Sequence, residues 1–125
     1  MARSDDLVNW QDCGVVAERP IQNGQGCGTC MMESPFVFKH GDLYYLVYNQ
    51  AEWMKYIISK DPLDFNNNKV RDFVDGVYNF EMVDIEIGLV AFTNCCYYPN
   101  LRFGVIKFDR NGLVSLDIHR DKHRL

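Results

Sequence analysis

Hydrophobic positions in this chain come in short runs separated by turn residues, and the clearest pair of runs lies within residues 33–49. Phe36–Phe38 forms the first run, Leu43–Tyr48 forms the second, and Lys39–Asp42, with its glycine, lies between them. This pattern predicts a β-hairpin. A strand with one wet face alternates apolar and polar residues, but the second run is apolar or aromatic at nearly every position. We therefore predict that this strand is covered on both faces.

Similar runs continue along the rest of the chain. A helix over Ala51–Lys60 also fits by propensity, but we prefer a strand there. The dipeptide Asn111-Gly112 is a strong signal for a further hairpin. The strands expected outside the first hairpin are Val15–Ala17, Met54–Ser59, Arg71–Val74, Glu81–Glu86, Leu89–Asn94, Leu101–Phe108 and Leu113–Leu116.

Residues 33–49 and 81–94 read alike: an acid, a strand, a glycine turn, an apolar strand and an asparagine. Their offset is close to one propeller blade of about 40–50 residues. Sets of four strands with apolar residues on both faces, and no amphipathic helix to cover them, predict sheets that stack on sheets. An all-β, β-propeller type of fold meets this requirement. The alternative is a β-sandwich, whose outer faces are expected to be polar.

The predicted organisation is a single partial propeller domain over residues 1–125. Its expected parts are the end of a preceding blade with a glycine-rich loop (1–32), one blade (33–76), the next blade (77–118) and a charged tail (119–125).

Composition and charge narrow the class of protein. Aromatic residues make up 14% of the chain, which suits strands and sugar-binding clefts as well as ordinary cores. The net charge of -4 argues against nucleic acid or an anionic membrane as partner. No apolar run reaches the about 18 residues of a membrane-spanning helix. The polar N-terminus has no apolar core of a signal peptide, so we expect a cytoplasmic location for the chain as given.

The five cysteines are unevenly spaced, as Cys13, a CxxC at Cys27 and Cys30, and the neighbours Cys95 and Cys96. A zinc site needs two pairs that each reach one metal, but neighbours on a strand point to opposite faces. A redox CxxC would open a helix beside a βαβ unit, and here it lies in a glycine-rich loop. An odd number of cysteines cannot pair completely within one chain. We expect mostly reduced thiols, no metal and no cofactor.

The segment ESPFVFKHGDLYYLVYN, followed by SKDPLDF, resembles the five-bladed β-propeller glycoside hydrolases of families 43 and 32 and their relatives. SDDLVNW resembles the outer strand of a blade in those families, and LRFGVIKFDRNGLVSL resembles their late-blade hairpins. The resemblance covers most of residues 3–117. It implies a propeller fold and hydrolysis of glycosidic bonds.

The resemblance assigns Glu33 as the general acid, because the Glu-x-Pro motif carries that role in those families. Glycoside hydrolysis needs a second carboxylate as nucleophile or base, which those families take from an aspartate of the first blade. This chain departs from them, since it shows no such aspartate. Five blades need more than about 200 residues, so the chain holds about two to three. We expect a fragment or a subunit that is inactive alone.

Three further residues are candidate substrate-binding residues. Glu81 has the same place as Glu33 in the repeated pattern, and Trp53 and Tyr97 offer aromatic faces to sugar rings. Each also has an ordinary structural reading, as a strand-end charge or a packing residue. The expected partners are a carbohydrate ligand and either a second copy of the chain or missing blades. The alternatives are a non-catalytic carbohydrate-binding or assembly module and a degenerate relative without activity.

Overall fold

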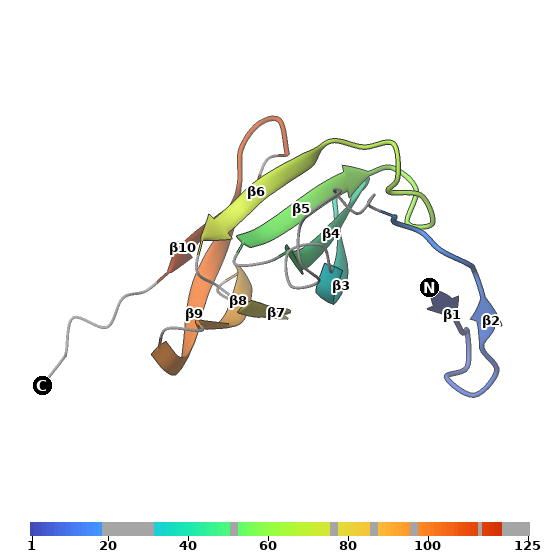
Figure 1. The fold of residues 1–125 in the computed structure, drawn as a ribbon, viewed down its shortest axis with the longest axis horizontal. Helices are drawn as coiled ribbons and strands as arrows, with labels where there is room; N and C mark the ends of the chain where they lie inside the picture. Colours follow the sequence, from blue (N-terminus) through green and yellow to red (C-terminus); the bar gives the residue numbers. More distant parts are fainter. Residues whose placement is uncertain are drawn as a thin grey trace, which may run out of the picture.

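Two four-stranded antiparallel sheets dominate the computed structural model (Figure 1). It describes residues 1–18, 32–50, 53–75, 78–85, 88–95, 98–112 and 114–118. The first sheet has the order β3 (Met32–His40), β4 (Leu43–Gln50), β5 (Trp53–Ser59) and β6 (Val70–Asp75). The second has the order β10 (Val114–Ile118), β9 (Tyr98–Phe108), β8 (Gly88–Cys95) and β7 (Tyr78–Ile85).

A separate two-stranded sheet at the N-terminus consists of β1 (Ala2–Arg3) and β2 (Gln11–Asp12). It lies apart from the larger sheets (Figure 1, blue). The predicted all-β class is therefore confirmed for the described residues, where none of the sheets is closed. The same residues contain no helix, and so no helix long and apolar enough to cross a membrane.

Most predicted strands and hairpins agree with the structure. Trp53–Ser59 is a strand, so the helical alternative for this segment was wrong. The Asn111-Gly112 dipeptide forms the turn between β9 and β10, where the Gly112 N–H donates to the Asp109 carbonyl at 3.0 Å. Most of the predicted glycine-rich loop before residue 33, and the predicted tail at 119–125, lie outside the described residues.

The two large sheets pack against each other in the same strand order. β3 contacts β7 at one side of the stack, and β6 contacts β10 at the other. Each sheet is a meander of consecutive antiparallel strands. The second meander therefore repeats the path of the first and lies against it.

The first sheet contributes most of the apolar layer between the sheets. Phe38 and Tyr45 stack with ring centroids 4.9 Å apart, and Phe108 of β9 meets both rings edge-on. We call this layer the inter-sheet core. Its buried members are Phe38, Tyr45, Val47, Met54, Tyr56, Ile106 and Val114.

The other face of the first sheet is covered as well. Leu46, Tyr48 and Ile57 are buried there against Phe65, which belongs to the loop between β5 and β6. We call this second layer the outer core. Successive residues of β4 thus alternate between two buried layers, because strand side chains alternate between faces. The prediction that this strand is covered on both faces is confirmed.

The N-terminal segment completes the outer core without forming the predicted strand. Val16 and Ala17 pack against the outer core, but the prediction of a strand over Val15–Ala17 was wrong. Only one backbone hydrogen bond joins Val16 to Phe65, from the Phe65 N–H to the Val16 carbonyl at 2.8 Å. Val16 and Ala17 therefore pack on the sheet without joining a strand ladder, and Val15 is exposed.

Two buried tyrosines fasten the first sheet to the β9–β10 hairpin. The Tyr45 hydroxyl donates to the Gly112 carbonyl at 2.9 Å, and the Val114 N–H donates to the Tyr56 hydroxyl at 3.4 Å. Burial raises the pKa of Tyr45, which keeps its hydroxyl protonated as a donor. These bonds satisfy polar atoms that packing removes from water.

We predict that Gly112→Ala destabilises the protein more than Gly41→Ala does. Both glycines have positive φ, 72° and 59°, so either alanine is strained by about 1–2 kcal/mol. A Cβ at Gly112 would also lie 2.9 Å from the Tyr45 hydroxyl, whereas nothing lies within 4 Å at Gly41. We expect this overpacking to add about 1–3 kcal/mol in denaturant unfolding.

The double variant Tyr45→Phe with Gly112→Ala is the internal control. Removing the hydroxyl relieves the collision, so the two losses in stability should be less than additive. Equal destabilisation by the two alanine substitutions would contradict the close approach of Gly112 and Tyr45.

Candidate functional site

Glu33 lies exposed at the beginning of β3, beside an irregular stretch of backbone. Its register partner on β4 is Asn49, while Phe36 pairs with Val47. Two residues, Ser34 and Pro35, therefore stand opposite one residue of β4, which is a β-bulge. Ser34 has φ of 50°, a conformation that a non-glycine residue adopts at a cost and that often marks functional sites.

Asn49 is a polar residue inside the structure, with 3% of its surface exposed. Its Oδ1 has no hydrogen-bond partner among the described residues. Residues directly opposite each other in an antiparallel pair share a face. Met54, opposite Asn49 on β5, belongs to the inter-sheet core, so Glu33 and Asn49 share that face at the end of the sheet.

Trp53 lies on the opposite face of the same sheet. It pairs with Gln50, which pairs with Met32, and Met32 packs on the outer core. Its side chain is 46% exposed, and the Lys55 Nζ lies 5.6 Å from its ring centroid. The strand alternation therefore separates Trp53 from Glu33, although both stand at the same end of the sheet.

Glu81 occupies a third position. It is exposed on β7, next to Met82, which packs against the inter-sheet core. Because neighbours on a strand alternate, Glu81 lies on the face of the second sheet that points away from the first. Glu33, Trp53 and Glu81 are thus distributed over three faces.

The register also changes the expected equivalence of Glu33 and Glu81. Asn94, the counterpart of Asn49, pairs with Tyr78, and Glu81 pairs with Phe92. Tyr78 therefore occupies the place in the second sheet that corresponds to Glu33. The spacing in the sequence indicates this difference, since Glu33 and Asn49 are 16 residues apart but Glu81 and Asn94 are only 13 apart.

Several of the other candidate residues lie outside the described residues. These include Tyr97 and three of the cysteines, Cys27, Cys30 and Cys96. Cys13 is a free thiol, half-buried beside the N-terminal sheet. Among the described residues, no group of three or more His, Cys, Asp or Glu side chains is placed to hold a metal ion.

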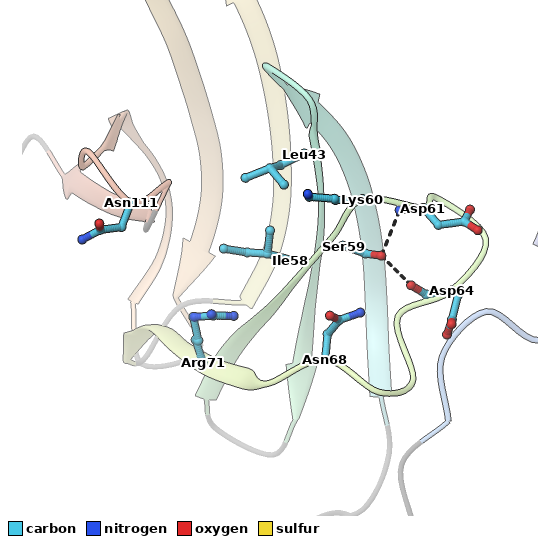
Figure 2. Close-up of a pocket in the computed structure, with 9 residues that line it drawn as sticks. All are labelled: Leu43, Ile58, Ser59, Lys60, Asp61, Asp64, Asn68, Arg71 and Asn111. Atoms are coloured by element: carbon cyan, nitrogen blue, oxygen red, sulfur yellow. Dashed lines mark hydrogen bonds between the residues drawn. The ribbon is translucent and has the colours of Figure 1, made fainter.

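A depression of about 490 Å³ lies at the end of the first sheet that is remote from Glu33 (Figure 2). The residues that form it come from the β3–β4 hairpin, the end of β5, the loop to β6, β6 itself and the β9–β10 turn. They are Leu43, Ile58, Ser59, Lys60, Asp61, Asp64, Asn68, Arg71 and Asn111. Sequence reasoning did not anticipate this grouping, because its members are distant in the chain.

The comparisons with known proteins add no relative. No protein-family model, no curated protein and no solved structure matches the chain. The resemblance to propeller glycoside hydrolases therefore stays a prediction from the sequence motifs around Glu33.

Asp6, in the N-terminal segment, has a lowered pKa because several groups donate hydrogen bonds to its carboxylate. The backbone N–H groups of Asn9 and Val8 donate to Asp6 at 2.7 and 2.9 Å. The Asn9 amide and the Ser4 hydroxyl also donate to it. Together these donors hold the pKa of Asp6 well below its ordinary value of 3.8. Asp6 closes the loop between β1 and β2 and is no part of the Glu33 site.

We predict that the carboxyl carbon of Asp6 titrates below pH 3.8 in a ¹³C NMR experiment. A depressed pKa in the folded state contributes stability that is present above the unfolded value and is lost as the pH falls through the folded value. The Asn9→Ala variant keeps the backbone donors, so its midpoint should return only part of the way towards 3.8. A midpoint at or above 3.8 in the unmodified chain would contradict the structure of this loop.

Proposed function

We propose that this chain is part of a β-propeller of the glycoside-hydrolase type and that Glu33 is its general acid. The observation that carries the proposal is the pairing of Glu33 with Asn49. An exposed carboxyl group at a bulged strand entrance stands directly opposite a buried amide whose oxygen has no partner among the described residues. A polar pair of this kind suits a ligand that is rich in hydroxyl groups.

The arrangement of the sheets supports a propeller architecture. Consecutive blades of a propeller are four-stranded meanders that pack face to face around an axis. The two meanders here pack in the same strand order, and the first is covered on both faces. In this proposal the outer core lies on the face of the first sheet against which a preceding blade packs. β3 and β7 are then the strands nearest the propeller axis.

The chemistry assigns separate tasks to the two residues. As general acid, Glu33 gives its proton to the oxygen of the departing sugar when the glycosidic bond breaks. The Asn49 Oδ1 is buried, so the strand end must open for a sugar hydroxyl to donate to it and for the ring to be oriented beside Glu33. The second carboxylate comes from another blade or from a second copy of the chain. We therefore expect the chain alone to be inactive on glycosides in plain buffer.

A small nucleophile tests the role of Glu33 despite the missing carboxylate. We predict that azide or formate supports slow release of phenol from phenyl arabinosides, xylosides or fructosides by the unmodified chain, because phenol is a poor leaving group that needs a proton. Glu33→Gln removes the proton donor, and the azide-supported rate should fall by about 100-fold or more. The readout is phenol absorbance with increasing azide concentration.

The matched control is Glu18→Gln, because Glu18 is also exposed but lies outside both large sheets. This variant should keep the full azide-supported rate. Equal rates for the unmodified chain, Glu33→Gln and a blank on all three substrate classes would refute the catalytic assignment.

A non-catalytic carbohydrate-binding or assembly module is the second candidate function. The exposed ring of Trp53, on the face away from Glu33, favours it, because aromatic rings can stack on the apolar faces of sugars. Calorimetry with arabino-, xylo- and fructo-oligosaccharides separates the two functions. Binding that is lost in Trp53→Ala and kept in Glu33→Gln would support the module.

A further inference from the structure

The depression in Figure 2 offers two cationic side chains without acidic partners. The ion pairs formed by the described residues are Arg3 with Asp5 and Lys55 with Asp72, so neither Lys60 nor Arg71 is neutralised there. Both line the depression, together with the apolar side chains of Leu43 and Ile58. Unpaired cationic side chains beside apolar side chains suit a small ligand that carries an anionic group and an apolar surface.

Arg71 is held in place by its surroundings. Its Nη1 donates to the Lys69 carbonyl at 3.0 Å, and its guanidinium lies 6.0 Å from the ring centroid of Tyr56. Tyr56 is itself buried in the inter-sheet core. Arg71 lies among the lining residues (Figure 2), and a guanidinium offers a planar fork of N–H donors that matches a carboxylate or a phosphate.

The two acidic residues of the lining are occupied by their own loop. The Asp61 carboxylate accepts the Leu63 N–H at 2.8 Å, and the Asp64 carboxylate accepts the Asn66 N–H at 3.0 Å. Figure 2 shows both carboxylates pointing away from Arg71. The lining thus carries two positive and two negative charges, but the charged group nearest to a ligand at Arg71 is the guanidinium itself.

Asn111 closes the depression from the second sheet. It stands in the β9–β10 turn, where its backbone N–H donates to the Asp109 carboxylate at 2.8 Å. Asn111 stands on the opposite side of the depression from Lys60, and its side-chain amide points outward, away from Arg71 (Figure 2). Because this side chain is exposed, its amide can rotate inward to bind a hydroxyl group of a ligand whose anionic group reaches Arg71.

We propose that this depression binds a small ligand that carries an oxyanion, either a carboxylate or a phosphate, on a compact hydroxylated body. Arg71 and Lys60 bind the oxyanion, Asn111 binds a hydroxyl group, and Leu43 and Ile58 contact the apolar face of the body. The site lies at the opposite end of the sheet from Glu33 and does not depend on the proposed catalytic function.

Calorimetry at low ionic strength tests this site with three probes: inorganic phosphate, glucuronate and neutral glucose. We expect saturable binding of at least one anion, weakened by added salt, and none of glucose. Binding of phosphate alone or of glucuronate alone identifies which oxyanion the site takes. Arg71→Gln should weaken the binding by about tenfold or more.

Two further variants keep the test decisive if Arg71→Gln perturbs packing on Tyr56. Lys60→Gln changes an exposed side chain of the lining and should also weaken binding of the anion. Lys55→Gln removes a cation that is paired with Asp72 outside the depression, so affinity should be unchanged. The proposal is overturned if neither anion binds saturably, if glucose binds as tightly as glucuronate, or if Lys60→Gln and Arg71→Gln bind like the unmodified chain.

Discussion

Burial of the first sheet on both faces is the constraint on which the rest of the structure depends. β4 places Tyr45 and Val47 in the inter-sheet core and Leu46 and Tyr48 in the outer core. The middle of a strand that is buried on both sides has no surface left for a ligand. The second sheet and the loop carrying Phe65 are needed to keep these side chains from water.

This constraint places the polar chemistry at the two ends of the sheet. At one end, Glu33 and Asn49 stand opposite each other beside the bulge at Ser34. At the other, Lys60 and Arg71 line the depression next to the β9–β10 turn. The bond from Tyr45 to Gly112 secures that turn, so the core and the depression depend on the same hairpin. The two proposed sites, one acidic and one with two cationic side chains, thus lie on the same sheet.

Local signals in the sequence were enough to predict most of the secondary structure. The Asn111-Gly112 turn and the continuous apolar run of β4 depend on neighbouring residues, and both were read correctly. Relations between residues that are far apart in the sequence were not predicted correctly. The three-residue difference in register put Tyr78, not Glu81, opposite Asn94, and strand alternation put Trp53 on the face away from Glu33. The depression could not be predicted, because Leu43, Arg71 and Asn111 meet only when the two sheets pack.

The central claim is that a sugar is bound at the Glu33 end of the first sheet, on the inter-sheet face. Chemical-shift mapping of backbone amides with arabino-, xylo- and fructo-oligosaccharides tests it most directly. The expected result is that the largest shifts fall on Glu33, Ser34 and Asn49, with little change at Trp53 and Lys55. Shifts centred on Trp53, or none with any of the three oligosaccharides, would contradict the claim.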